Sequence, residues 1–418
     1  MSFYKPINIQ NDLFFQLSDN FVTKTSETKH ATMKRILPVI VLSQFCCTSL
    51  WFAGNAILPD LTKHFNIDAN NLAHLVSAVQ FGFISGTFLF ALSGLVDRFV
   101  ATRIFFVCSI LAAFCNISVV MVHTTESILL ISRFLTGFFL AGIYPVGMKI
   151  ASDHYQKGLG KSLGLLVGAL VLGTAFPHFL KGFNTNYSWE FVLWATAGLS
   201  VLGGSMMVLL VPQGQYSTVA KKIDFRAITT GFKIHNFRSP ALGYFGHMWE
   251  LYTFWAFLPA LILSYKTQHH LTDINVSQWA FVIIASGSIA CVVGGYLSEY
   301  FGTKKVAVFA LSLSCFCCLI SPIMLMYASV PVLFGFLLFW GMVVIADSPL
   351  FSTLVAQNAP IESKGTLLTI TNSIGFSLTI LSIQIIGILS NVINPHYLYI
   401  FLAIGPILGI AMLLKKAS

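Results

Sequence analysis

Four ionisable side chains stand inside long apolar stretches of this sequence, and they are its strongest candidates for chemistry. They are Arg133, Lys149, Glu250 and Asp347. A charge that is removed from water is unfavourable unless it is paired, hydrogen-bonded or neutralised. Each of these residues is therefore expected to face other polar protein groups or a water-filled passage.

The two basic residues lie in one stretch, RFLTGFFLAGIYPVGMKIASDHY, which runs from Arg133 to Tyr155. On a helix, Arg133 would share a face with Gly137 and Tyr144. The small glycine would leave room for the long cation to reach into a cavity, although Arg133 could instead form a fixed ion pair that aligns helices. Lys149 would lie about 160° around the helix from Arg133, and its ammonium is expected to reach the polar surface.

Glu250 lies in a stretch rich in aromatic residues, GYFGHMWELYTFWAFLP. His247 would share its helix face, and Trp249 and Tyr252 would lie close to it. A carboxylate in such apolar surroundings suits reversible protonation, and the aromatic rings could contact an organic solute. The alternative is a structural glutamate that stays neutral or paired.

Asp347 precedes a proline in the stretch ADSPLFSTL, with Trp340 seven residues earlier on the same predicted helix face. Pro349 is expected to interrupt the helix just after Asp347, because proline removes a backbone hydrogen bond. The Asp–Ser–Pro unit could therefore act as a hinge or as a point that coordinates an ion.

Several uncharged polar residues could line the same passage, although polar residues within membrane helices often only join neighbouring helices. Gln44, Thr48, Trp51 and Asn55 would share one helix face, and Thr174 and His178 belong to another segment. Thr369, Thr371 and Asn372 belong to a third.

The composition excludes an ordinary soluble enzyme. The 418 residues are 56% hydrophobic and 9% charged, whereas soluble domains carry about 25% charged residues. Most apolar runs can cross a bilayer, which takes about 20 residues, and lipid requires them to be helical. We expect an all-α membrane protein with twelve transmembrane helices, at residues 36–60, 72–96, 104–123, 127–150, 160–183, 189–212, 240–265, 276–298, 305–327, 331–355, 365–390 and 396–414.

The basic residues predict the orientation. With both termini in the cytoplasm, 19 of the 24 Lys and Arg lie on the inner side, as the positive-inside rule requires. The net charge of +9 then reflects topology, and nothing suggests nucleic-acid binding. The polar tail 1–35 lacks the apolar core of a cleavable signal peptide, so the first span would serve as the targeting signal. The Phe-rich and Lys-rich composition favours an integral multi-pass protein of the bacterial inner (plasma) membrane.

The chain divides into two sets of six helices, 36–212 and 240–414. They are separated by a cytoplasmic loop at 213–239, and residues 415–418 form the cytoplasmic C-terminus. A motif repeats at corresponding places: GYLSEYFGTKK ends in Lys304 and Lys305 and contains Glu299, and SGLVDRFVATR contains Asp97, Arg98 and Arg103. Repeated halves are common in transporters.

These motifs resemble the loops after helices 2 and 8 of the major facilitator superfamily. The first copy departs from the family pattern, with Ser93 and Val100 in place of glycine and Ala101 in place of a basic residue. The series Arg133, Gly137, Ala141 and Gly142 resembles the family's helix 4 signature. The segment PIESKG, at 360–365, resembles the family's loop before helix 11.

The resemblance implies two pseudo-symmetric six-helix bundles around a central cavity that opens alternately to either face. It also implies a cytoplasmic gate, in which Asp97 lies against the start of helix 11 and Arg98 or Arg103 pairs with Asp153. The gate residues of the second half would be Glu299, Lys304 and Lys305. The alternative is that Arg98 and Arg103 serve only as topology signals.

We interpret the chain as a secondary transporter of a small organic solute. The sequence shows no catalytic motif, cofactor site, metal site or ATP-binding domain. Two acidic residues within the spans, without a sodium site, favour proton coupling. We expect a monomer in the lipid bilayer, and the eight cysteines read as small packing residues. The solute and proton path would comprise Arg133, Glu250, Asp347, Gln44, Trp51, Asn55, Tyr144, Trp249, Tyr252, Trp340 and Asn372.

Other functions stay open. The chain could be a uniporter or an exporter of the same fold without proton coupling, or a membrane sensor that transports nothing. A nitrate porter is weakened because spans 2 and 8 lack an interior arginine. A membrane-embedded enzyme is weakened because the catalytic motifs are missing.

Overall fold

The computed structural model describes residues 35–65, 72–121, 125–155, 159–183, 188–216 and 226–415. The tail 1–34 and residues 416–418 lie outside the described residues, as does part of the central loop. Within the described ranges the chain is almost entirely helical and contains no strand, as expected for a protein whose backbone polar groups must be satisfied in lipid.

The N-terminal lobe begins with a helix at Arg35–Thr48. It continues through α2 (Ala53–Ala56), α3 (Leu58–Phe65), α4 (Leu72–Ser93), α5 (Leu95–Arg98), α6 (Ala101–Met121), α7 (Glu126–Leu140), α8 (Tyr144–His154), α9 (Leu159–Phe183) and α10 (Glu190–Leu210).

The C-terminal lobe follows a short connecting helix, α11 (Arg226–Lys233). It comprises α12 (His235–Gln268), α13 (Val276–Phe301), α14 (Thr303–Tyr327), α15 (Val330–Ala346), α16 (Ser348–Asn358), α17 (Lys364–Leu389), α18 (Pro395–Leu398), the 3₁₀ helix η2 (Tyr399–Ala403) and α19 (Ile404–Leu414).

Ten helices of the described residues are long and apolar enough to cross a membrane, and they match ten of the predicted spans. The other two predicted spans differ for physical reasons. Span 36–60 is interrupted at 49–52, and span 240–265 lies in α12, a 34-residue helix with many polar and aromatic side chains. Buried residues occur all around α12, so it does not need the lipid-facing apolar surface of its neighbours.

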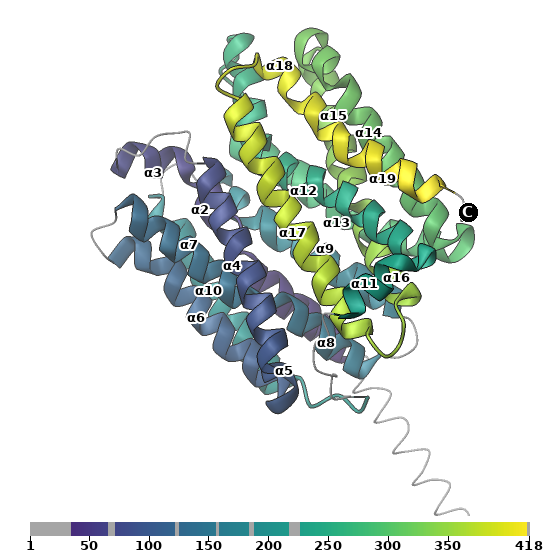
Figure 1. Cartoon of the computed structure of the whole chain (residues 1–418). Coiled ribbons are helices and arrows are strands. Elements are labelled where there is room, and N and C mark those ends of the chain that lie inside the picture. Colours follow the sequence, from purple (N-terminus) through teal and green to yellow (C-terminus); the bar gives the residue numbers. More distant parts are fainter. Residues whose placement is uncertain are drawn as a thin grey trace, which may run out of the picture.

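The two lobes meet along two symmetry-related helix pairs. The fifth helix of the N-terminal lobe, α9, packs along the second of the C-terminal lobe, α13, and α4 packs in the same way along α17. Figure 1 shows the purple and blue helices of the first lobe beside the green and yellow helices of the second. This arrangement is the pair of pseudo-symmetric bundles that the resemblance implies.

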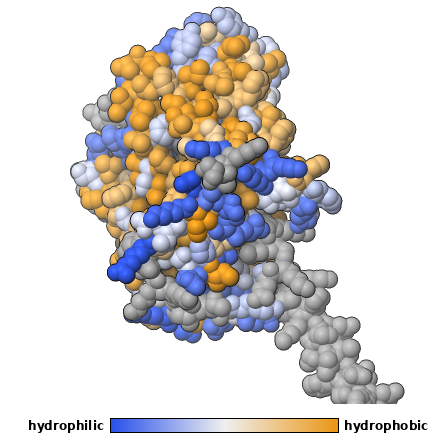
Figure 2. All heavy atoms as spheres, turned by 45° about the vertical axis from the view of Figure 1, so that its right-hand side comes forward, coloured by the Kyte–Doolittle hydropathy of each residue, from blue (hydrophilic) through white to orange (hydrophobic). Residues whose placement is uncertain are grey.

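The outer surface of the helices is apolar. On α14, Phe309, Phe316 and Ile323 follow one another at seven-residue intervals and are 64%, 56% and 56% exposed. Figure 2 shows hydrophobic side chains over much of the upper part of one face, with hydrophilic ones mostly across its middle and lower part. Such a continuous apolar surface is unusual for a soluble monomer and is suited to lipid.

The fourth membrane helix of each lobe is broken near its middle. Residues 141–143 separate α7 from α8, and Asp347 alone separates α15 from α16. Pro145 and Pro349 stand in the first turn of the following helix, where proline's missing N–H costs no hydrogen bond. The interruption that we predicted just after Asp347 therefore falls on Asp347 itself.

Glycines allow α4 and α7 to approach each other closely. A Cβ atom added to Gly82 would collide with the carbonyl group of Phe134, and one added to Gly137 would collide with that of Val79. Both obstacles are backbone atoms, so neither can rotate away. Small residues that let backbones approach are a common means of packing membrane helices.

We predict that Gly82→Ala will destabilise the protein by about 1–3 kcal/mol, the usual range for overpacking. Gly198→Ala in α10 is the matched control, because nothing lies within 4 Å of an added Cβ there. Thermal unfolding of the two detergent-purified variants measures the difference. Equal melting temperatures would contradict this account of the α4–α7 contact.

Candidate functional site

The break in the first membrane helix is held by Arg133. Nη2 of Arg133 donates to the carbonyl oxygens of Leu50 at 3.1 Å and Trp51 at 2.6 Å, both inside the interrupted segment. Nη1 donates to Oδ1 of Asn116 at 3.1 Å. An interrupted helix exposes carbonyls that lipid cannot satisfy, and the guanidinium supplies the missing donors.

Gly54, rather than Gly137, makes room for this arginine. A Cβ atom on Gly54 would lie 3.1 Å from Nε of Arg133, whereas Gly137 packs against Val79. The expectation that Gly137 provides the space was therefore wrong. Arg133 is 4% exposed and lies within its own lobe, where it joins the first helix to α6 and α7.

Glu250 is the centre of a second polar cluster, in the C-terminal lobe. Its Oε1 accepts hydrogen bonds from Ser314 Oγ at 2.5 Å, Trp340 Nε1 at 2.7 Å and Cys318 Sγ at 3.2 Å. Glu250 on α12 is thereby connected to α14 and α15. Cys318, which the sequence suggested was only a packing residue, has a polar role, and Trp340 contacts Glu250.

Asp347 forms a third cluster with His247 of α12. Its Oδ1 lies 2.8 Å from His247 Nδ1, and both side chains are 1% exposed. Because Asp347 is the residue at which α15 ends and α16 begins, this contact ties the break to α12. His247 and Glu250 are three residues apart on α12. This helix therefore carries one of the two buried acidic residues described in the lobe and contacts the other.

Arg133 and Glu250 do not contact each other in this structure. The guanidinium is bonded to groups of the N-terminal lobe, and the carboxylate is bonded to groups of the C-terminal lobe. A pair between these two residues in another conformation stays a hypothesis.

Aromatic rings from both lobes meet at the centre of the molecule. The ring of Trp51, in the broken first helix, lies 4.9 Å from Phe83 and 6.5 Å from Tyr144 within its own lobe. It stacks on Tyr252 at 5.8 Å and on Phe376 at 5.9 Å in the other lobe. We call these five residues the central aromatic cluster.

Other predicted path residues are distributed around this cluster. Nδ2 of Asn55 lies 3.5 Å from the carbonyl oxygen of Ala256 across the lobe interface, and Asn372 is half-buried, one turn before Phe376. Gln44 is buried inside the N-terminal lobe against Gly147. Trp249 instead points to the far side of its lobe, where Nε1 donates to Phe401 at 3.3 Å.

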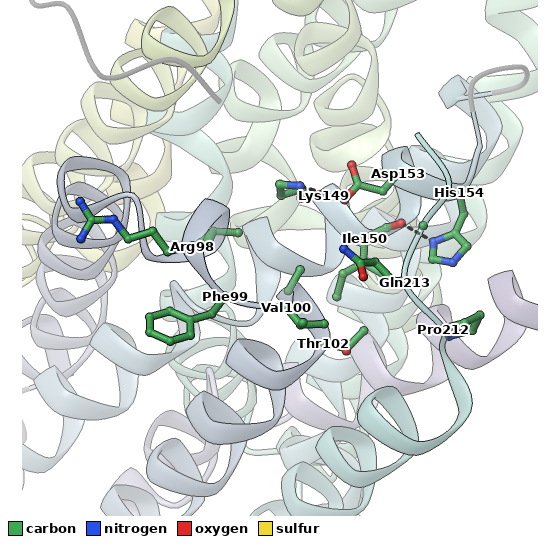
Figure 3. A pocket seen from close by; sticks show the side chains of 13 residues that line it. Arg98, Phe99, Val100, Thr102, Lys149, Ile150, Asp153, His154, Pro212 and Gln213 are labelled. Carbon is green, nitrogen blue, oxygen red and sulfur yellow. Dashed lines mark hydrogen bonds and ion pairs between the residues drawn. The ribbon is translucent and has the colours of Figure 1, made fainter. Parts of the chain in front are cut away.

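A pocket of about 160 Å³ lies at the end of the N-terminal lobe, and the predicted gate residues Arg98 and Asp153 are among those that line it. Figure 3 shows Arg98 directed away from Asp153. Asp153 pairs with Lys149 at 2.8 Å, and the backbone N–H of Tyr216 donates to its carbonyl oxygen at 3.0 Å. In this structure Asp153 thus contacts Lys149. Its pairing with Arg98 or Arg103, which the resemblance implies, stays a prediction.

The other predicted gate residues are Asp97, Arg103, Glu299, Lys304 and Lys305. Nothing is described of the Asp97 side chain, and Arg103, Glu299, Lys304 and Lys305 are exposed. Gly302, in the second copy of the motif, has a φ of 89°, which other residues rarely adopt. This turn between α13 and α14 explains why the second copy retains glycine at that position.

The sequence matches the model of a known protein family, the Major Facilitator Superfamily, over residues 40–383. The chain belongs to the major facilitator superfamily. It is thus a membrane transporter rather than an enzyme. No curated protein matches the chain significantly.

Solved structures of this superfamily share the fold. The human organic anion transporter MFSD10 (TETRAN) has a TM-score of 0.71 at 13% identity, and the match covers 91% of this chain and 99% of that one. The proton:xylose symporter XylE, bound to 6-bromo-6-deoxy-D-glucose, has a TM-score of 0.70 at 14% identity, covering 91% and 95%.

We predict that Arg133→Met will lower stability strongly, because Leu50, Trp51 and Asn116 lose their donors. Each buried acceptor left without a partner costs about 1–3 kcal/mol. Arg133→Lys should recover only part of the loss, since one ammonium does not reproduce the planar guanidinium fork.

Thermal unfolding in detergent compares these variants with Arg238→Met, which changes an exposed arginine. If Arg133→Met melted at the same temperature as Arg238→Met, Arg133 would not be what holds the broken helix.

Proposed function

We propose that this superfamily member moves a small organic solute by alternating access and couples that movement to protons. The observation that carries the proposal is the position of Trp51. This residue lies in a broken helix of one lobe and stacks on Tyr252 and Phe376 of the other. Alternating access requires these contacts to separate, and a solute entering between the lobes would take the place of the rings that part.

Proton coupling is supported by the surroundings of Glu250. The three groups that donate to Oε1 are an alcohol, a thiol and an indole, all of them neutral. An ionised carboxylate only accepts hydrogen bonds, whereas its protonated form also donates one. Binding or release of a proton would therefore change the bonds that join α12 to α14 and α15.

The His247–Asp347 pair would pass such a change to the fourth helix of the C-terminal lobe. Asp347 is the single residue between α15 and α16, so a shift in its contact with His247 changes the angle that this break allows. Glu250 and His247 lie on the same helix, and Trp340 and Asp347 lie on the same broken helix. Movement at one cluster is thus mechanically linked to the other.

The gate and the orientation remain part of the proposal. The distribution of the basic residues supports an orientation with both termini in the cytoplasm. The protein would act as a monomer in a bacterial inner membrane. The Lys149–Asp153 pair would belong to this gate. Asp153 would exchange Lys149 for Arg98 or Arg103, with Asp97 at helix α17, when the other face opens. Glu299, Lys304 and Lys305 form the matching surface of the second lobe.

Reconstituted protein in liposomes tests proton coupling. We predict that labelled solutes taken up by the wild type will accumulate only under an imposed pH gradient. Glu250→Gln should abolish that accumulation and leave exchange of labelled for unlabelled solute within about threefold of wild type. The physical reason is that an amide cannot take up and release a proton while the solute site stays intact.

Glu126→Gln is the control, because Glu126 is an exposed residue in the first turn of α7. It should accumulate solute as the wild type does. Gradient-independent uptake by the wild type would replace proton coupling with uniport. Full accumulation by Glu250→Gln would remove Glu250 from the proton path.

A further inference from the structure

We infer that the transported solute is an uncharged, multiply hydroxylated molecule, bound between the lobes by hydrogen bonds and aromatic faces. The inference rests on the proposed transport function and specifies its substrate class. It follows from buried polar atoms at the lobe interface that have no protein partner among the described residues. These atoms belong to Trp51, Gln80, Thr174, His178, Trp255 and Ser373, which we call the interface polar set.

Gln80 faces the second lobe. Its neighbours on the same side of α4 are Ser77, which accepts a hydrogen bond from Gln384 of α17 at 2.8 Å, and Phe83, whose ring lies 4.5 Å from Phe376. On a helix, the direction of residue 80 falls between those of residues 77 and 83. Neither the oxygen nor the nitrogen of its amide has a hydrogen-bond partner among the described residues, so one side chain offers a donor and an acceptor.

Thr174 and His178 lie on the face of α9 that packs along α13. Thr174 and His178 share a helix face with Val171 and Gly182, because these four positions follow one another at intervals of three, four and four residues. Val171 lies against Gly287 of α13, and Gln278 donates to the carbonyl oxygen of Gly182 at 3.0 Å. His178 is 1% exposed, and its Nε2 has no partner.

The C-terminal lobe contributes the matching groups. Trp255 of α12 contacts Phe52 of the first lobe at 6.4 Å, and its indole N–H is without a partner. Ser373 lies one turn before Phe376 on α17, so both side chains leave the helix on nearly the same side. This is the side on which Phe376 contacts Trp51 and Phe83. The set therefore contains hydroxyls, an amide, an imidazole and indoles, supplied by both lobes.

The ionisable residues Arg133, Glu250 and Asp347 contact groups of their own lobe. Arg133 is bonded to two carbonyls and Asn116, and Glu250 Oε1 accepts from three donors. Asp347 Oδ1 lies against His247 Nδ1, whereas Asp347 Oδ2 and His247 Nε2 have no partner among the described residues. Each of these contacts stays within one lobe. A charged solute between the lobes would lack a counter-ion and would be strongly disfavoured, whereas hydroxyl groups can satisfy the interface polar set.

The central aromatic cluster adds a preference for a ring. Trp51 is nearly parallel to Tyr252 and Phe376, with interplanar angles of 30° and 26°. Flat aromatic surfaces with a few placed polar groups are typical of small-molecule sites. A cyclic polyol has a matching shape, with carbon-bound hydrogens on its faces and hydroxyls around its edge.

Binding to the purified full chain tests the substrate class, with tryptophan fluorescence as the readout. The panel contains neutral hexoses, pentoses and cyclitols, and the matched series D-glucose, D-glucuronate and D-glucosamine. We expect at least one neutral polyol to bind saturably, and each charged counterpart of a bound sugar to bind at least tenfold more weakly. Equal or tighter binding of an acid or an amine overturns the inference, as does a panel in which no neutral polyol binds.

Variants identify the site. Gln80→Leu and Ser373→Ala should each weaken polyol binding about tenfold, the loss of one good hydrogen bond. Ser377→Ala should leave binding unchanged, because that hydroxyl is exposed and donates to its own helix at 2.8 Å. Wild-type affinity in both site variants, with normal melting temperatures, would place the polyol elsewhere.

Transport of the bound polyol into liposomes is measured separately. Binding without any transport would refute the proposed function and leave the substrate class standing. Transport of a charged solute with no polyol binding would refute the substrate class and leave the proposed function standing.

Discussion

The structure depends on the hydrogen bonds between Arg133 and the carbonyls of the broken first helix. Without water in the membrane interior, a helix can open only where another group satisfies its backbone. Arg133 supplies that group from α7, and Gly54 gives it space. The break places Trp51 at the lobe interface, where it meets Tyr252 and Phe376. A buried cation that looks like a transport residue thus acts first as a brace for the helix that carries the central ring.

The same constraint explains how charge is distributed between the lobes. Arg133, Glu250 and Asp347 each contact groups of their own lobe, so the lobes can part without separating these residues from their partners. The contacts that cross the interface are aromatic stacking, helix packing and single hydrogen bonds such as that from Gln384 to Ser77. These are weak enough individually to exchange for contacts with a solute or with water.

The two lobes are similar in architecture and different in the chemistry of their breaks. Both fourth helices are interrupted ahead of a proline, but only the C-terminal break contains an acidic residue, Asp347, paired with His247. In the N-terminal lobe the first helix is also open and is held by a permanently charged guanidinium. One lobe therefore has a fixed guanidinium brace, and the other has the buried carboxyl groups at which we propose proton exchange.

The sequence by itself determined the membrane class, ten of the spans, the repeat and the identity of the buried ionisable residues. These features depend on local composition, because hydrocarbon penalises any charge within an apolar run wherever its neighbours lie. Only the tertiary structure decided which groups these residues contact. Glu250 meets Ser314 and Trp340 from helices that follow 64 and 90 residues later, and no local pattern shows how helices are rotated against one another. The opening of the first helix was hidden for the same reason, since Arg133, which stabilises it, comes 82 residues after Trp51.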